Sequence, residues 1–529
     1  MSAVRTADND PQSFRTAWWQ RLAAERASYE ITRFAVLRLL ALVYLAAFVS
    51  LAWQGAALFG SHGLLPAGEF LAASRARLGS EAFLRLPTLF WWGASDAALA
   101  LAWTCGIVLS VAVLAGVTNA GVQLVLWAIY GSFVAVGQIF YGYGWELQLL
   151  ETGMLAVFLC PLCSVRPFPR RRTPKVTVWL LRWLIFRVML GAGLIKLRGD
   201  SCWRDLTCLD FHFETQPNPN PLSFWFHHAP HAVHVAGVVF NHFVELAVPW
   251  FAFGFRRARH VAGAFLVALQ FILILSGNLS FLNWLTIVPA LACFDDVAFV
   301  HALPRSTRRG LLEGFMALPA SRGQTVATGA FGVVVLVLSV GPVVNLLSSE
   351  QQMNASFDPL ALVNTYGAFG SVDRTRTEVI LEGTRDASPG PLSDWRPYEL
   401  PCMPGAERRH PCWIAPYHDR LDWQMWFVGN DAARGEPIED EPWLVHLVWQ
   451  LLLGEEGPKS LLANDPFPGA PARWVRAGIW RYEFAPPFSG SAWWRRRRIG
   501  EYLPPVSIEH AGLRGYVRDR RWPDALPGG

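Results

Sequence analysis

One loop of the sequence combines a lysine, two cysteines, histidines and a carboxylate. It reads LIKLRGDSCWRDLTCLDFHFETQPNPNPLSFWFHHAP and directly follows an apolar run. Lys196 ends that run, where a lysine often does no more than extend its ammonium group to the membrane interface. His212 and Glu214 could exchange protons or, with His227 and His228, bind a metal. Because no recognised ligand spacing is present, we predict neither a metal nor a cofactor.

Four of the eight cysteines are candidates for disulfides. Cys202 and Cys208 lie in the loop, and Cys402 and Cys412 lie in the carboxyl-terminal region. Two local bridges are plausible if both regions face an oxidising compartment. Spacing alone does not prove pairing, so four free thiols remain an open alternative.

Common catalytic motifs are missing from the sequence. It contains no GxSxG elbow, no HExxH helix and no phosphate-binding glycine loop, which leaves standard hydrolase, zinc protease and nucleotide-binding functions without support. The net charge of +5 is small and spread along the chain. We therefore expect no nucleic-acid partner.

The composition is that of a membrane protein. Of 529 residues, 52% are hydrophobic and 16% are charged, and the mean hydropathy is +0.26. We predict a polytopic α-helical membrane protein with about 7 to 9 transmembrane helices. The candidate spans are residues 34–58, 96–117, 120–141, 147–163, 177–196, 233–254, 260–277, 281–295 and 327–347, of which the fourth and eighth are short.

Arginine and lysine clusters predict the orientation, because such clusters stay on the cytoplasmic side. With nine crossings, all the basic clusters face the cytoplasm, and the loop and carboxyl terminus face away. The domains expected are a cytoplasmic leader (1–33), a transmembrane domain (34–347) with a non-cytoplasmic loop (197–232), and a non-cytoplasmic, mainly β domain (348–529).

Short strand-like segments follow residue 347. Residues 377–386 alternate β-branched side chains, WRPYEL suggests a second strand, and RLDWQMWF (420–427) suggests a third. PWLVHLVWQLLLGEE (442–456) has proline at its start and glycine near its end, which predicts a core helix.

The loop closely resembles the signature loop of the lipase maturation factor family. YGWELQLLETGMLAVFLCP, SGNLSFLNWLTIVPALACFDD and NTYGAFGSVDRTRTEVILEGTRD, followed by RLDWQMWF, extend the likeness over most of the chain. The resemblance implies a folding factor rather than an enzyme, which helps client proteins, dimeric lipases in the family, to reach an active state. It implies the endoplasmic reticulum membrane in eukaryotes; the arginine- and alanine-rich composition suggests a bacterial source, and then the cytoplasmic (inner) membrane.

The resemblance places the functional weight on the loop and on the carboxyl-terminal domain. Aromatic loop residues could hold partly folded clients or form an interfacial belt beside membrane lipids; they are Trp203, Phe211, Phe213, Phe224, Trp225 and Phe226. The other candidate loop residues are Cys202, Arg204, Asp205, Cys208, His212, Glu214, Gln216, Pro217, Asn220, Pro221, His227 and His228. The candidate motif of the carboxyl-terminal domain is Asp422, Trp423, Gln424 and Trp426.

Two alternatives come from other functional classes. GAGLIKLRGDSCW has a weaker likeness to vitamin K-dependent gamma-carboxylases, which would make Lys196 a catalytic base with His212 or Glu214 as proton partner. A transport or structural role is the second alternative, because polar residues at membrane depth could line a pathway; they are Glu146, Glu151, Arg182 and Arg187.

Overall fold

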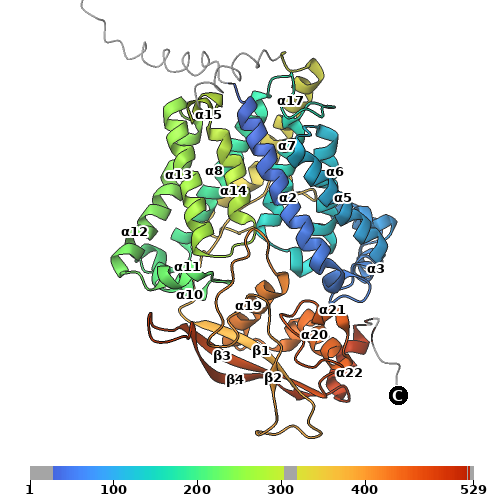
Figure 1. Cartoon of the computed structure of the whole chain (residues 1–529). Coiled ribbons are helices and arrows are strands. Elements are labelled where there is room, and N and C mark those ends of the chain that lie inside the picture. The colour runs from blue at the N-terminus through green and yellow to red at the C-terminus, as the bar shows by residue number, and fades with distance from the viewer. Residues whose placement is uncertain (1–27, 303–317, 521, 523, 525–529) are drawn as a thin grey trace, which may run out of the picture.

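The computed structural model describes residues 28–302, 318–520, 522 and 524. Most of the predicted leader and three arginines of the last basic loop (305, 308 and 309) lie outside these residues. A helical bundle forms one part of the described molecule, and a smaller carboxyl-terminal domain covers one end of it (Figure 1).

Each of the nine predicted apolar runs is helical. Six helices are long and apolar enough to cross a membrane, counting only the described part of the chain. They are α2 (Glu30–Phe59), α5 (Asp96–Ala115), α8 (Lys175–Arg198), α12 (His231–His242) with its continuation η3 (Phe243–Ala247) and η4 (Val248–Phe253), α13 (Arg256–Ser276), and α17 (Arg322–Leu338) with α18 (Val340–Leu347). The predicted polytopic helical fold is confirmed.

Three shorter apolar helices complete the bundle: α6 (Ala120–Val136), α7 (Gly144–Leu159), and α14 (Leu282–Ala290), which η5 (Leu291–Cys293) extends. Most side chains of α7 and α14 are buried. These two helices are therefore surrounded by protein, which explains why neither needs the full length of a lipid-facing span.

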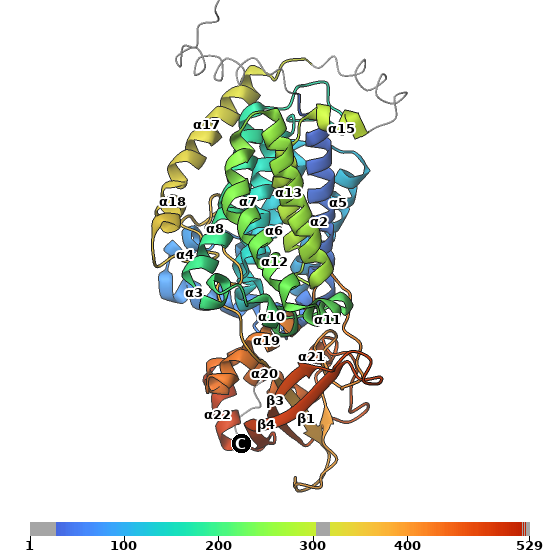
Figure 2. The ribbon, with the colours of Figure 1, turned by 90° about the vertical axis from the view of Figure 1, so that its left-hand side faces the viewer.

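The two ends of the bundle differ (Figures 1 and 2). At one end lie α15 (Asp296–Ala302) and a contact between Arg171 and Leu318. At the other end lie the carboxyl-terminal domain and the short helices α3 (Ala67–Leu78), α4 (Glu81–Arg85), η1 (Leu89–Trp92), η2 (Gln138–Tyr141), α9 (Ser201–Arg204), α10 (Leu209–Thr215) and α11 (Pro221–His227). The signature loop and the carboxyl-terminal domain thus share one end.

The carboxyl-terminal domain contains a four-stranded antiparallel sheet in the order β2-β1-β3-β4. Its strands are β1 (Arg376–Thr384), β2 (Arg396–Pro397), β3 (Trp474–Phe484) and β4 (Trp494–Val506), and its helices are α19 (Arg420–Ala433), η6 (Ile438–Asp440), α20 (Pro442–Leu453), α21 (Glu456–Lys459) and α22 (Ala511–Asp519). The two strands predicted first and the core helix are confirmed.

The third predicted strand, RLDWQMWF, is wrong: these residues begin helix α19. The eight residues contain no β-branched side chain, and leucine, methionine and glutamine are good helix formers. Helix α19 lies between the sheet and the bundle (Figure 1), so nearly all faces of its first two turns are buried. Burial on every side hides the periodicity that distinguishes a helix from a strand.

Arg420 of α19 anchors the carboxyl-terminal domain in the bundle. Its Nη1 lies 2.9 Å from Oε1 of Glu146 on α7, and both side chains are fully buried. The guanidinium also donates to the Phe140 carbonyl at 2.6 Å and lies 3.4 Å from the ring centroid of Tyr141. Trp145 donates to the same carboxylate at 2.9 Å. The pair is thus enclosed by groups that replace water.

The other polar groups at membrane depth also have protein partners. Arg187 pairs with Glu151, whose carboxylate accepts a hydrogen bond from the Tyr366 hydroxyl at 2.8 Å. Arg182 donates to the Ala292 carbonyl at 2.8 Å. These contacts make the residues structural links between helices and the segment that leads to the sheet.

We expect the Glu146–Arg420 pair to matter through its balance of charge. Arg420→Met alone leaves a buried carboxylate without a counter-ion and should lower the free energy of unfolding by about 3–5 kcal/mol. Adding Glu146→Gln should recover most of that loss, because neither charge then remains. Thermal unfolding of the detergent-solubilised chain measures both effects.

The exposed pair Arg85–Glu81 is the matched control, since its side chains are 66% and 63% exposed. Arg85→Met should cost less than about 1 kcal/mol. A double variant as unstable as Arg420→Met alone would contradict the role we give to charge balance.

Candidate functional site

The signature loop folds into the three short helices α9, α10 and α11. The Asp200 carboxylate accepts from the Cys202 amide at 3.0 Å and caps α9. Asn220 and Ser223 form a capping box at the start of α11, where Pro221 is the first helical residue. Local capping therefore sets the path of the loop.

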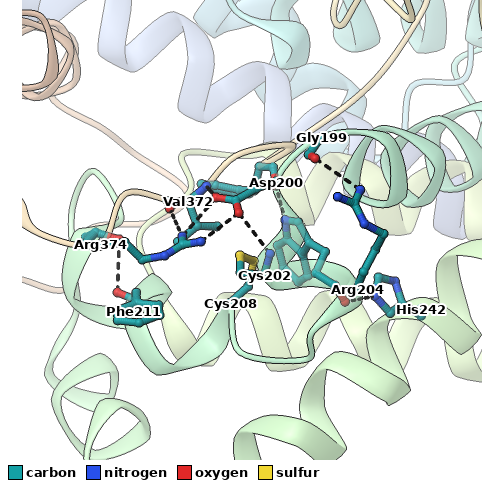
Figure 3. Close-up of a disulfide and its surroundings, with 12 residues drawn as sticks. Gly199, Asp200, Cys202, Arg204, Cys208, Phe211, His242, Val372 and Arg374 are labelled. Atoms are coloured by element: carbon teal, nitrogen blue, oxygen red, sulfur yellow. Dashed lines mark hydrogen bonds and ion pairs between the residues drawn. A yellow bond between two sulfur atoms is a disulfide. The ribbon is translucent and has the colours of Figure 1, made fainter. Parts of the chain in front are cut away.

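A disulfide and an ion pair hold the first turn of the loop (Figure 3). Cys202 is bonded to Cys208, with their Cα atoms 4.8 Å apart. Arg374 pairs with Asp200 at 2.8 Å, and its hydrogen bonds lower the pKa of that carboxyl to about 2. Trp203 donates from Nε1 to the Phe369 carbonyl at 2.7 Å. The segment before β1 is thereby fastened to the loop.

Arg376, the first residue of β1, binds the backbone at the end of α10. Its guanidinium donates to the carbonyls of Glu214 and Pro217 at 2.9 Å each, and also to the carbonyl of Gln216. The carboxyl group of Glu378 lies 2.6 Å from this guanidinium. These carbonyls lie at and beyond a helix end, where backbone acceptors lack helical partners. The sheet and the loop are therefore joined by buried, charge-assisted hydrogen bonds.

Glu214 is a second contact between the loop and the sheet. Its Oε2 accepts from the Phe484 amide at 2.6 Å and lies 3.5 Å from Nε2 of His227. Burial raises the pKa of Glu214 to about 7 and lowers the pKa of His227 to about 4. Near neutral pH a proton can therefore be held at Glu214, while His227 stays neutral.

The four candidate metal ligands do not converge. His212 faces the ring of Phe369, with centroids 4.8 Å apart, and burial lowers its pKa to about 4. His228 shares a hydrogen bond of 2.8 Å with the Phe224 carbonyl. Glu214 lies near His227, whose ring centroid is 5.1 Å from that of His228, but within the described residues the ligand atoms of the four side chains do not gather around one point.

Among the described residues, one other cluster has metal-ligand geometry: Cys402, Asp419 and Asp422. The Cys402 sulfur, however, is bonded to Cys412, with Cα atoms 5.4 Å apart. A disulfide sulfur is a poor ligand, because metals bind the thiolate. This cluster therefore gives no support to a metal site.

Several loop residues serve the loop itself. Gln216 donates to the Ser276 carbonyl at 2.9 Å, and Asn220 donates to the Leu275 carbonyl at 3.2 Å. Arg204 donates to the Leu197 carbonyl at 2.6 Å, and no ion pair with Asp205 is formed among the described contacts. The first two bonds tie the loop to the end of α13.

Lys196 does not reach toward the membrane interface as the sequence suggested. Its side chain is buried, and Nζ lies 2.5 Å from Oε1 of Glu245 in the π-helical turn η3. Asn241 donates to the same carboxylate at 2.9 Å, and the ammonium lies 5.1 Å from the ring centroid of Trp203. An ion pair inside the bundle replaces the predicted interfacial anchor because a buried carboxylate requires a counter-ion.

The carboxyl-terminal motif lies on α19 and faces both the loop and the bundle. Trp426 donates to the Thr215 carbonyl at 2.9 Å, and Gln424 donates to the Tyr143 hydroxyl at 2.7 Å. Trp423 packs edge-on against Trp145, with centroids 4.8 Å apart. Asp422 instead accepts from the Cys402 amide at 2.6 Å.

The loop aromatics are mostly not available to a client. Trp203, Phe213 and Phe224 are buried, whereas Trp225 is 46% exposed. Phe224 contacts Phe484 and Trp493 of the sheet region, at centroid distances of 5.3 and 5.0 Å. The idea of an open aromatic loop surface is therefore wrong for these three residues. Phe224 packs on the sheet region, whereas Phe213 stacks on Phe226 within the loop, with centroids 5.4 Å apart.

A cavity of about 350 Å³ lies where the bundle meets the carboxyl-terminal domain. Residues from α7, α8, α13, α14 and α19 line it, together with the segment 366–371. Sequence reasoning missed this cavity, the carboxylate of Glu245, and Arg376, which binds backbone carbonyls at the end of α10. The signal for Glu245 was a single acidic residue inside the predicted span 233–254.

The helices and the junction define a class: a polytopic membrane protein with one extramembrane domain fastened to an end of its bundle. Residues 31–301 match the family model described as the lipase maturation factor transmembrane domain, and residues 362–504 match the lipase maturation factor C-terminal domain. The chain belongs to the lipase maturation factor family.

Relatives cover nearly the whole chain. Lipase maturation factor 1 of Bos taurus is 47% identical, over 94% of this chain and 93% of its own length. The Homo sapiens protein of that name is 45% identical, over 95% and 91%. Lipase maturation factor 2 of Gallus gallus is 30% identical, over 92% and 83%. No solved structure matches the chain significantly.

The raised pKa of Glu214 predicts a pH-dependent junction. The folded chain holds this proton up to about pH 7, whereas an ordinary glutamate loses it near 4.5. The stabilising effect of the proton is therefore full below pH 4.5 and is lost as the pH rises through 7. Glu214→Gln keeps a neutral acceptor for the Phe484 amide and should avoid that loss.

We expect the stability difference between Glu214→Gln and the unchanged chain to grow by about 1–3 kcal/mol between pH 4.5 and pH 8. Thermal unfolding in detergent at several pH values measures the difference, and His212 and His227 are present in both proteins. A difference that stays constant with pH would refute the proton at Glu214.

Proposed function

We propose that the chain is a membrane-embedded maturation factor that helps lipases reach an active folded state. The observation that carries the proposal is its likeness to lipase maturation factor 1 over 94% of the chain, transmembrane and carboxyl-terminal parts alike. The loop and the carboxyl-terminal domain are bonded to one another at one end of the bundle, which supports client contact at that end.

We further propose that this end faces away from the cytoplasm. The described basic residues support this: Arg171 and Arg256 lie at the opposite end of the bundle, where the positive-inside rule expects the cytoplasm. Two disulfides at the loop end support an oxidising compartment. The membrane is that of the endoplasmic reticulum in a eukaryotic host and the inner membrane in a bacterial one.

A reporter tests the orientation. A protein that fluoresces only in the cytoplasm, fused after Gly529, should stay dark in full-length fusions, because the carboxyl terminus lies outside. The same reporter fused before Met1 should be bright and is the control. Bright full-length carboxyl-terminal fusions would reverse the orientation.

A complementation assay tests the maturation role. Cells that lack their own lipase maturation factor 1 are given this chain and a secreted lipase, and lipase activity is divided by lipase mass in the medium. We expect the ratio to rise severalfold over cells with an empty vector. Membrane expression of the chain without any rise in the ratio would contradict the proposal.

The same assay separates the folding role from base catalysis at Lys196. If Lys196 serves only to neutralise Glu245, the double variant Lys196→Met, Glu245→Gln removes both charges and should keep most of the maturation activity. Lys196→Met alone leaves a buried carboxylate and should lower the amount of folded chain. A well-folded double variant that is as inactive as the empty vector would favour the base.

A further inference from the structure

The cavity at the junction has the composition of a ligand site. Its volume of about 350 Å³ is within the range of small-molecule pockets. Its walls are largely apolar and aromatic, with Met189 and Ala192 on α8, Phe369 beside the loop, and Trp423, Trp426 and Phe427 on α19. Such walls suit a hydrocarbon chain.

Neutral polar side chains gather on one side of this cavity, on α7, α13 and α14. Gln148 donates to the Thr286 hydroxyl at 3.1 Å, and Asn283 donates to Oε1 of Gln270 at 2.9 Å. All four side chains are buried and line the cavity. A buried amide group needs hydrogen-bond partners. Polar side chains at membrane depth are costly, and their presence there indicates a functional site.

Gln270 and Asn283 have unused hydrogen-bonding capacity. In the described part of the chain, the Gln270 amide nitrogen donates only to the sulfur of Met189, at 3.8 Å, and sulfur is a weak acceptor. Within the described residues, the Asn283 carbonyl oxygen receives no hydrogen bond. One donor and one acceptor are thus free for a ligand.

The charge in the cavity is already balanced. Glu245 is the one charged residue of its lining, and Lys196 pairs with it at 2.5 Å. A phosphate or a free carboxylate in the cavity would find no free counter-ion among the described lining residues and would lose its hydration. The site therefore favours an uncharged ligand.

We propose that this cavity binds a neutral single-chain lipid of the monoacylglycerol class. The acyl chain lies along the aromatic and aliphatic walls, and the ester and hydroxyl oxygens take the free donor of Gln270 and the free acceptor of Asn283. Helices α7, α8, α13 and α14 line the cavity on the side of the bundle, and α19 lines it on the side of the carboxyl-terminal domain. The proposal does not depend on the maturation of lipases.

Photolabelling of the purified full-length chain tests the site. The probe is a monoacylglycerol with a diazirine in its acyl chain, and labelled peptides are mapped by mass spectrometry. We expect saturable labelling of α8, α14 or the segment 366–371. Unlabelled monoolein should compete with it, and the anionic lipid phosphatidylglycerol should not.

Two variants locate the ligand, and one controls for bulk. Ala192→Phe fills the cavity and should abolish saturable labelling. Asn283→Leu removes the polar partner at nearly equal size and should weaken competition by monoolein about fivefold. Val108→Phe adds bulk to an exposed position of α5 and should change nothing.

The thermal unfolding of each variant in detergent is also measured. Only variants that unfold at the same temperature as the unchanged chain are compared, so loss of folding is distinguished from loss of binding. Labelling spread over lipid-facing helices, or labelling unchanged in a folded Ala192→Phe chain, would overturn the proposal. Competition by phosphatidylglycerol as strong as by monoolein would also overturn it, because the site would then not select a neutral headgroup.

Discussion

The buried ion pair between Glu146 and Arg420 is the constraint on which the architecture depends. A carboxylate on a short helix surrounded by protein is costly unless a cation reaches it, and that cation comes from the carboxyl-terminal domain. The bundle is therefore incomplete without α19. The second pair, Glu151 and Arg187, uses Asn364 and Tyr366 in the same way, just before β1. In both pairs, a residue from the carboxyl-terminal part of the chain reduces the free-energy cost of burying a carboxylate inside the bundle.

The signature loop follows the same principle with backbone groups. Arg376 donates hydrogen bonds to carbonyls at the end of α10, and Arg374 forms an ion pair with Asp200, the residue that caps α9. A loop bonded in this way is a structural joint between the bundle and the sheet. The many charged and aromatic residues of the loop therefore serve mainly to bond the bundle to the sheet. Few of them form an exposed surface that could bind or react with another molecule.

The sequence was informative where a pattern is local. Apolar length gave the helices, and proline and glycine gave the bounds of α20. It could not give partners that are distant along the chain: Glu245 for Lys196, or Arg420 for Glu146, which lie 49 and 274 residues apart. The strand predicted for RLDWQMWF was wrong for a related reason: the residues that surround this segment are distant along the chain. At the candidate site, the sequence indicated the loop and the α19 motif, but the cavity between them arises only from tertiary packing.

The exposed edge of the sheet carries charged side chains that oppose pairing with the backbone of an unfolded chain. Strand β4 is at an edge of the sheet, where unpaired backbone groups invite pairing with another chain. Its exposed residues include Arg495, Arg497 and Arg498, and charged side chains on an edge oppose such pairing. Trp225 of the loop and Phe488 are exposed apolar side chains, and their ring centroids lie 5.8 Å apart. An open strand edge would hold an unfolded chain through many backbone hydrogen bonds at once, and the exposed arginines of β4 oppose that pairing.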